Sequence, residues 1–232
     1  MTLYWPTAVL RPQSVSAPFL APRTLAGSAS INGQTQVSAT DAGVWVYSLT
    51  NIELFDRQRV LCWRAIEGLL EGRLTPINVP LYGYELGYAP YALDLDYAAL
   101  LVPVPHSDTS YFSDGSGYVG GIADIKTAGS AALRATSMTV TVTYGPTLQS
   151  GMIFSIYHPQ TKGNRWYKVR TFDASTGAMT FRPPLREAIV ADTRLEFDRP
   201  TCRMRLASDA EMTLDLDYNT IGYPSVSFVE DL

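Results

Sequence analysis

The sequence has little of several residue types on which metal and thiol chemistry depends. It contains two cysteines and two histidines among 232 residues. A zinc centre needs several such ligands at close spacing, and neither His106 nor His158 lies near a cysteine. Cys62 lies in a helical pattern and Cys202 in an alternating one, far apart in the chain. These shortages argue against a zinc centre, and they favour two buried free thiols over a disulfide.

Charge and long apolar runs are scarce as well. Charged residues make up 17%, below the roughly one quarter of a typical domain. The net charge is −4 and no Lys/Arg run exists, which argues against binding DNA or RNA through phosphates. No apolar run approaches the ~20 residues of a membrane-spanning helix, and the N-terminus does not resemble a signal peptide. We therefore expect that the protein does not insert into a membrane. We also expect that it is made in the cytoplasm.

What the sequence does have is apolar content and β-type alternation. Hydrophobic residues make up 46%, which excludes a largely disordered chain. The low charge fits a surface partly covered by partner subunits, and it fits equally a β-rich domain with Thr, Ser and Tyr on its outer faces. The first 25 residues contain four prolines, which favour an extended arm over a helix.

One stretch, residues 52–71, has the pattern of an α-helix. Thr50 and Glu53 have the spacing of a capping box, and Gly72 and Pro76 are stop signals. The predicted apolar stripe consists of Leu54, Leu61, Ala65 and Leu69, widened by Phe55, Cys62, Ile66 and Leu70. The predicted outer, charged face contains Arg57, Arg64, Glu67 and Glu71. We expect the stripe to pack on a sheet and the charged face to meet an adjacent subunit.

The remaining segments favour strands. Asn32-Gly33 is a strong hairpin signal within residues 26–49, and residues 77–81 read as a strand directly after the helix. Residues 136–199 contain five short alternating segments, which suggest a small barrel of the OB or SH3-like kind. Alternation resumes after Pro200, and the expected strands there are 202–206, 212–218 and 226–228. We expect these last strands to return to the N-terminal sheet.

No constellation of side chains predicts an enzyme. Asp94/Asp96 and Asp215/Asp217 each place two carboxylates on one strand face, which is more often a solvated face than an acid–base or Ca²⁺ site. Three other motifs are weaker, namely the adjacent His106-Ser107-Asp108, the calcium-loop fragment Asp114 to Gly117, and four scattered tryptophans. The sequence therefore assigns no catalytic, cofactor-binding or metal-binding residue, and we expect no cofactor and no enzymatic activity.

Three stretches together resemble a known group of proteins. They are WRAIEGLLEGRLTPINVPLY (63–82), SGMIFSIYHPQTKGNRWYKVRTF (150–172) and TFRPPLREAIVADTRLEFDRPTCRMRLA (180–207), followed by the ending PSVSFVEDL. In their general residue pattern and in their order along the chain, the three stretches are similar to distal tail proteins. These are the minor tail or tail-tip ring components of long-tailed bacteriophages and gene-transfer particles. The similarity spans most of the chain except residues 85–125, where a Tyr/Gly-rich segment departs from the family.

The resemblance implies a mainly β fold, namely a β-sandwich with one flanking α-helix plus an inserted small OB/SH3-like β-barrel. It places the belt-like sandwich and the helix 52–71 in residues 1–90 and 200–232. Residues 91–199 would be the inserted region, with a loop-rich segment 91–135 and the barrel 136–199. No functional residue carries over, because the family has no catalytic motif.

The resemblance also implies a function and partners. The expected protein is a virion structural component, a hexameric ring that joins the tail tube protein to the tail-tip hub protein. It would be assembled in the host bacterial cytoplasm and located in the virion tail, with DNA only passing through the lumen. The alternative is a carbohydrate-binding β-module of a tail tip or cell surface. That alternative depends on Tyr82, Tyr84, Tyr88, Tyr91, Tyr111 and Tyr118, whose rings would stack on sugars.

Overall fold

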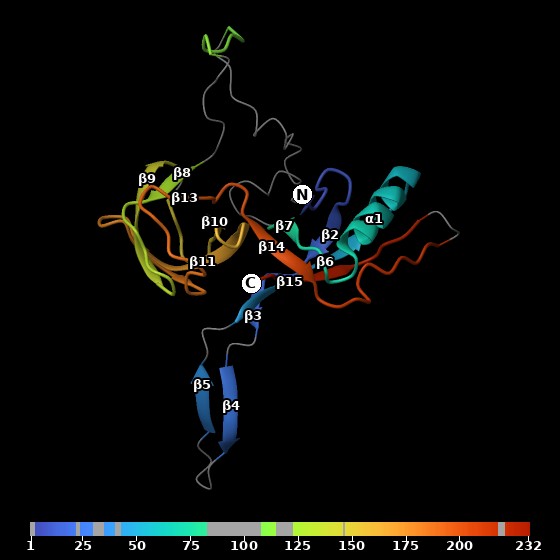
Figure 1. The fold of residues 1–232 in the computed structure, drawn as a ribbon, viewed down its shortest axis with the longest axis horizontal. Helices are drawn as coiled ribbons and strands as arrows, with labels where there is room; N and C mark the ends of the chain where they lie inside the picture. The colour runs from blue at the N-terminus through green and yellow to red at the C-terminus, as the bar shows by residue number, and fades with distance from the viewer. Residues whose placement is uncertain are drawn as a thin grey trace.

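Two β-sheet bodies and one α-helix make up the main part of the chain in the computed structural model (Figure 1). The structure describes residues 3–21, 24–29, 35–39, 43–82, 108–114, 123–145, 147–217 and 221–232; for 24–29 and 35–39 it describes the backbone alone. The predicted fold class is confirmed: the chain is mainly β, with one flanking helix and a small barrel.

The first body, here called the belt sheet, is built from both ends of the chain. Its strands are β1 (Leu3–Tyr4), β2 (Pro12–Val15), β3 (Phe19–Ala21), β6 (Val44–Ile52), β7 (Ile77–Pro80), β14 (Thr201–Leu206) and β15 (Val226–Glu230). They lie in the order β1-β7-β14-β15-β6-β2, with β3 also paired to β6. Burial alternates along β6, where Trp45, Tyr47 and Leu49 are buried. The C-terminal segment thus fills the middle of a sheet that the N-terminal segment begins.

Helix α1 (Arg57–Leu70) begins later than the sequence predicts. Thr50 and Glu53 do not form the expected capping box, because Thr50 is still part of the extended strand β6. Asp56 is the N-cap instead, and its carboxylate accepts a hydrogen bond from the backbone N–H of Arg59 at 2.8 Å. The helix ends where Glu71 and Gly72 adopt left-handed backbone angles, as the predicted stop signal at Gly72 requires.

The face that α1 buries differs from the predicted stripe. Trp63, Ile66 and Leu70 are the buried residues of the helix, and Trp63 is fully enclosed. Leu61 and Leu69, which the stripe placed in the core, are 50% and 51% exposed. The face with Trp63 is buried in place of the face with the leucines because Trp63 has the larger side chain. Its indole N–H also donates to a buried partner, the carbonyl of Met212, at 3.0 Å.

The second body, here called the barrel, has six strands rather than the five predicted. They are β8 (Asp124–Thr127), β9 (Ser137–Tyr144), β10 (Ile153–His158), β11 (Gly163–Asp173), β12 (Ala178–Arg182) and β13 (Arg194–Leu195), in the order β10-β11-β12-β9-β8-β13. A bridge between Ser155 and Glu196 brings the two ends of this order together and nearly closes the cylinder. The extra strand, β8, lies within the segment 91–135 that was predicted to be rich in loops.

The chain leaves the belt sheet, builds the barrel and then returns beside its point of departure. Strands β7 and β14 are antiparallel neighbours, with Pro80 opposite Thr201 and Ile77 opposite Met204. All six barrel strands lie between them in the sequence. The predicted return of the C-terminal strands to the N-terminal sheet is therefore confirmed for β14 and β15.

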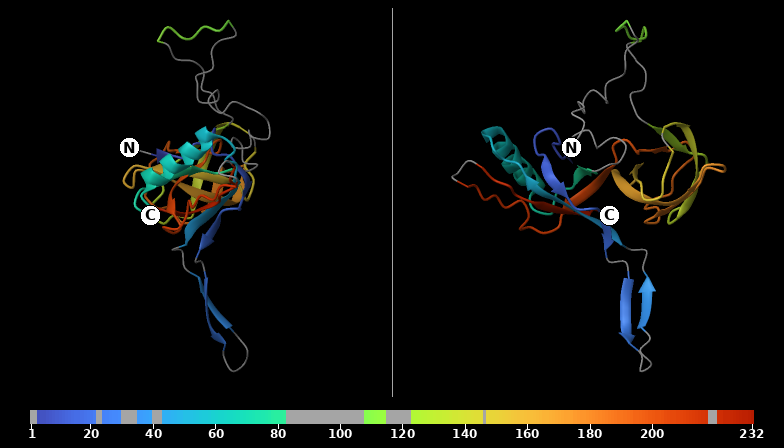
Figure 2. Two further views of the ribbon diagram at one scale, coloured as in Figure 1. Left: turned by 90° about the vertical axis from the view of Figure 1, so that its right-hand side faces the viewer. Right: turned by 180° about the vertical axis from the view of Figure 1, so that it is seen from behind.

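A separate hairpin, β4 (Thr24–Ala29) with β5 (Thr35–Ala39), projects from the body (Figure 2). Its two strands pair with each other and with no other strand that the structure describes. The predicted Asn32-Gly33 turn falls between them but lies outside the described residues. A two-stranded hairpin alone in water is marginally stable.

The predicted strand 212–218 is wrong. Between β14 and β15 the chain makes a long excursion, residues 207–225, which holds isolated bridges rather than a strand among its described residues. The excursion lies on the α1 side of the belt sheet, away from the barrel (Figure 1). Residue alternation misled the prediction because Leu214 and Leu216 are only partly buried, and the described part of this segment forms one isolated bridge, from Asp217 to Ile221, rather than a ladder.

Candidate functional site

Most of the residues that the sequence analysis considered for chemistry lie apart or outside the described part of the chain. Asp94, Asp96, His106 and Ser107 fall outside the described residues, as do Tyr84, Tyr88, Tyr91 and Tyr118. Asp108 accepts hydrogen bonds from the backbone and hydroxyl of Ser110, and these bonds lower the pKa of its carboxyl. This is a local turn, and it gives the weak His/Ser/Asp motif no support.

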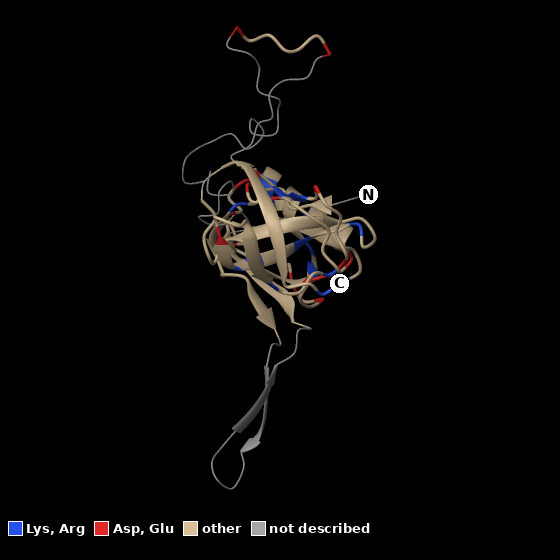
Figure 3. Ribbon diagram, turned by 90° about the vertical axis from the view of Figure 1, so that its left-hand side faces the viewer, with Lys and Arg blue, Asp and Glu red and all other residues tan. Residues whose placement is uncertain are grey.

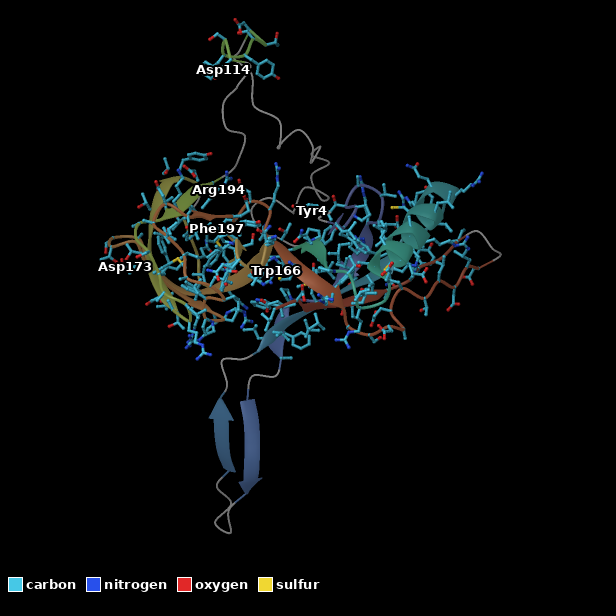
Figure 4. The ribbon with its side chains drawn as sticks, in the orientation of Figure 1. Tyr4, Asp114, Trp166, Asp173, Arg194 and Phe197 are labelled. Atoms are coloured by element: carbon cyan, nitrogen blue, oxygen red, sulfur yellow. The ribbon has the colours of Figure 1, made fainter. Side chains whose placement is uncertain are left out.

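Aromatic residues that were candidates for stacking on sugars are mainly core residues. Trp5, Trp45, Trp63 and Trp166 are at most 3% exposed, as expected for tryptophans that are structural. Tyr82 is also buried, whereas Tyr111 is 46% exposed. Trp166 lies between the barrel and the belt sheet (Figure 4). The carbohydrate alternative therefore loses Tyr82 and, within the described residues, rests on Tyr111 alone.

The two cysteines are free thiols, as predicted, but only one is fully buried. Cys202 is enclosed in β14, and burial raises the pKa of its thiol. Cys62 is partly exposed on α1, and partial burial raises its pKa too. A raised pKa disfavours the thiolate, so neither cysteine has the character of a nucleophile. Within the described ranges no three His, Cys, Asp or Glu side chains gather in a way that could hold a metal ion.

A buried group of charges lies at the junction between the belt sheet and the barrel, and it is centred on Glu230. The Glu230 carboxylate accepts hydrogen bonds from Arg186 at 2.9 Å and from the backbone N–H of Trp45 at 3.1 Å. Arg165 lies 3.9 Å from it and is itself buried. Arg186 also donates to the carbonyl of Gly43 at 2.6 Å. Two barrel arginines thus hold the last strand of the belt sheet.

Aromatic packing reinforces this junction. The indole N–H of Trp45 donates to the carbonyl of Trp166 at 2.7 Å, and the two rings meet edge to face with centroids 6.3 Å apart. Tyr47 packs edge to face on Trp166 at 5.3 Å. Its hydroxyl accepts from the backbone N–H of Tyr82, while burial raises its pKa. The core of the belt sheet therefore extends across the junction to Trp166 and Ile153 of the barrel.

His158 is a buried histidine whose partners are structural. Its Nε2 lies 2.7 Å from the hydroxyl of Tyr167, which accepts from the backbone N–H of Arg186 at 3.0 Å. Its Nδ1 lies 4.0 Å from Glu187. Burial lowers the pKa of His158 to about 4, with Arg165 and Arg186 adding to the effect and Glu187 opposing it. His158 is therefore neutral at physiological pH and helps to fill the barrel core.

A second group of charges fixes the belt sheet to a barrel turn and to the end of α1. Asp231 accepts from Arg203 at 2.8 Å and from Arg205. Arg203 also donates to the carbonyl of Thr161 in the barrel at 2.6 Å. Gly163 allows this approach, because a Cβ there would lie 2.6 Å from Cδ of Arg203. These arginines, like those at Glu230, are used to hold the fold together.

One cleft is lined by three cations for which the described residues provide no ion pair. It has a volume of about 470 Å³ and lies between β3 and the outer wall of the barrel. Its lining residues are Pro18, Phe19, Leu20, Trp45, Gly151, Lys168, Val169, Arg170 and Arg182. Lys168 and Arg182 are opposite each other across β11 and β12. Arg170 lies at a β-bulge two residues after Lys168, and it is exposed and lines the same cleft. We call this the basic cleft.

The excursion carries the opposite charge. Residues 207–225 contain Asp209, Glu211, Asp215 and Asp217 and no Lys or Arg. Asp209 accepts from the backbone N–H of Arg73, and Glu211 accepts from that of Ser227, so these two carboxylates help to fix the excursion to the body. Asp215 and Asp217 are exposed, and they are the pair that the sequence analysis placed on one strand face.

Sequence reasoning missed the basic cleft and the Glu230 junction. The i, i+2 spacing of Lys168 and Arg170 was a signal for a shared strand face, but its meeting with Arg182 and Phe19 depends on how the two bodies pack. On the barrel side of the molecule, segments of both signs lie close together (Figure 3). The basic cleft is thus a local feature, and it is not part of a broad basic surface of the kind that binds nucleic acid.

No family model matches the chain, and no curated protein matches it.

Proposed function

We propose that the protein is a structural component of the tail end of a tailed bacteriophage or gene-transfer particle, with no enzymatic activity. In this role it forms a ring between the tail tube and the tail-tip hub. The single observation that carries the proposal is the way the chain leaves and re-enters the belt sheet. Strand β7 gives way to the complete barrel, and β14 returns to pair directly with β7. This is the inserted-barrel arrangement that the resemblance to distal tail proteins implies.

The outer surface of α1 supports an assembling protein. Leu61, Ala65 and Leu69 are spaced by one helical turn and are all exposed. Gly68 beside them has open space where a side chain would be. Exposed leucines in a row on a helix are typical of a surface that a partner covers. The predicted charged face, with Arg57, Arg64, Glu67 and Glu71, is exposed as well, so the contact surface is mixed rather than purely charged.

The projecting hairpin supports the same proposal. β4 and β5 extend from the base of the belt sheet as an isolated two-stranded ribbon (Figure 2). Such a ribbon contributes little to the stability of its own domain and is well placed to lie along a neighbouring subunit. The buried side chains of the belt sheet and the barrel are, by contrast, used in packing. The surfaces proposed for binding, the exposed face of α1 and the β4–β5 hairpin, therefore lie on the outside of the molecule.

Purified protein tests the proposal by its state of assembly, alone and mixed with a tail tube protein. Light scattering coupled to size exclusion should give a closed oligomer, and negative-stain images should show rings of one size. Leu61→Asp/Leu69→Asp should reduce the oligomer while leaving the monomer folded, because both side chains are about half exposed. The control is Lys126→Asp/Arg134→Asp, two charge changes on the barrel, away from α1 and outside the basic cleft. A stable monomer that never forms rings under either condition contradicts the proposal.

A further inference from the structure

We infer that the acidic excursion of one copy docks in the basic cleft of the next copy, and that this head-to-tail contact joins subunits in the assembly. The inference rests on the proposed function, since a ring provides the second copy. It names the two surfaces that meet and the chemistry by which they recognise each other, namely carboxylates at Asp215 and Asp217 against cations at Lys168, Arg170 and Arg182.

The first reason is that the cations of the basic cleft have no carboxylate partner among the described residues, unlike most arginines around them. Arg165 and Arg186 approach Glu230, and Arg203 and Arg205 bind Asp231. The ion pairs of the described residues involve neither Lys168 nor Arg170 nor Arg182.

Arg182 lines the same cleft and is only partly buried. Lys168 lies directly opposite it on β11 and is exposed, as is Arg170. The three cations together make this cleft positively charged.

The second reason is that the excursion offers matching chemistry. Asp215 and Asp217 are exposed, and no Lys or Arg occurs anywhere from residue 207 to the end of the sequence. Ile221, which forms a bridge with Asp217, is 41% exposed, and Tyr223 is 54% exposed. The basic cleft has its own exposed aromatic residue, Phe19, at 54%. Each surface therefore combines charge with exposed apolar groups, and the charges are opposite.

The third reason is geometry. The excursion extends beside α1, and the barrel wall that lines the cleft lies on the other side of the belt sheet (Figures 1 and 2). The cleft and the excursion of one chain therefore do not meet, and the contact is between copies. An interface that joins two different surfaces is heterologous, and such interfaces close into rings when the rotation between copies allows it.

The experiment uses the full-length chain and reverses charge on one surface at a time. The cleft variant is Lys168→Glu/Arg170→Glu, and the excursion variant is Asp215→Lys/Asp217→Lys. Each change places like charges opposite each other at the proposed contact, so each variant alone should self-associate at least about tenfold more weakly than the wild type in sedimentation velocity.

Mixing the two variants is the decisive step. The acidic excursion of the cleft variant then faces the basic cleft of the excursion variant, and the reversed surfaces are also complementary to each other. The mixture should regain the wild-type strength of association, and high salt should weaken both the wild type and the mixture. The control Lys126→Glu/Arg134→Glu makes the same charge change on barrel cations outside the cleft and should have no effect. The neutral pair Lys168→Gln/Arg170→Gln replaces the cleft variant if the latter does not fold, and it should weaken association less.

Three results overturn the inference: self-association unchanged by either reversal, folded variants that do not recover on mixing, and a wild type that does not self-associate. If the cleft instead holds an acidic segment of a different protein, the first of these results is obtained. Rings that persist unaltered in both variants remove this contact and leave the proposed function standing. A salt-sensitive association restored by mixing, but without closed rings or binding to a tube protein, supports the contact and removes the ring function.

Discussion

The belt–barrel junction and the basic cleft are neighbours that use cations in opposite ways. At the junction, Arg165 on β11 is buried beside Glu230 and serves the fold. Three residues later on the same strand, Lys168 is exposed in the cleft, with no ion pair in the described structure. One strand thus supplies both a cation that holds the two bodies together and a cation that is exposed in the cleft. Removing the first should cost stability, and removing the second should not.

The largest effect is expected from Glu230→Ala. This change removes the acceptor of Arg186 and leaves the buried Arg165 without its carboxylate. Breaking a buried ion pair on one side costs about 3–5 kcal/mol, because the remaining charge stays buried without a partner. Urea denaturation of the variant should show this loss in the free energy of unfolding. Glu67→Ala on the exposed face of α1 is the control, with an expected change within about 0.5 kcal/mol. Equal, small losses in the two variants would mean that the junction does not hold the fold.

A similar contrast on α1 comes next. Ile66 is 8% exposed and Leu61 is 50% exposed, although the sequence placed both in one apolar stripe. Ile66→Asp buries a carboxylate without a partner and should lower the free energy of unfolding by about 4 kcal/mol. Leu61→Asp should cost less than about 1 kcal/mol, because the side chain of Leu61 is already half exposed in the folded protein. Thermal unfolding followed by circular dichroism distinguishes the two variants; comparable losses in both would restore the predicted stripe.

His158 should make the barrel side of the junction sensitive to acid. Its pKa falls from 6.5 in the unfolded chain to about 4 in the folded one, mainly through burial. As the pH falls through 6.5, His158 becomes protonated in the unfolded chain but stays neutral in the folded protein. The free energy of unfolding therefore decreases until about pH 4. The shift corresponds to roughly 3 kcal/mol at most.

His158→Gln should remove much of this loss without removing the polar contact to Tyr167. The measurement is the difference in free energy of unfolding between about pH 7.5 and pH 4.5, which should shrink in the variant by about 2–3 kcal/mol. Glu187 also reduces stability as the pH falls, in the wild type and in the variant alike. Its carboxyl pKa is lowered in the folded protein because hydrogen bonds from Thr161 outweigh the effect of burial. An unchanged difference would show that His158 is not the buried titrating group.

The smallest effect on stability is expected in the basic cleft. Lys168→Gln and Arg170→Gln should each change the free energy of unfolding by less than about 0.5 kcal/mol, because both side chains are exposed and make no ion pair in the described structure. Chemical denaturation at low protein concentration checks this while avoiding assembly. A loss as large as that of Glu230→Ala would make the cleft part of the junction and erase the contrast.

Sequence patterns predicted the fold where period and packing agreed. Alternation predicted β9, β11, β12 and β14, because one face of each is more buried than the other. The hairpin was predicted from the turn signal at Asn32-Gly33 between its strands. Local chemistry also set the end of α1, since Gly72 tolerates a left-handed backbone that other residues resist.

Hydrophobic patterns predicted wrongly where the same spacing fitted two different structures. Leu61 and Leu69 fit a helical stripe as well as Ile66 and Leu70 do, and only the sheet beneath α1 selects between them. Residues 212–218 alternate like a strand, but among the described residues they pair only through the isolated bridge of Asp217 with Ile221. The same limit applies to the cleft, because Phe19 and Arg182 are brought together by the docking of the two bodies.

The sequence by itself determined that this is a mainly β protein with one helix and free thiols. These features follow from the spacing of hydrophobic residues, from turn residues and from composition. All three act between residues close together in the sequence and need no long-range contact. The tertiary structure alone decided which arginines are buried at Glu230, which face of α1 is covered, and which cations are left at the basic cleft. Those outcomes depend on burial and on the distance between segments far apart in the chain, and no local pattern encodes them.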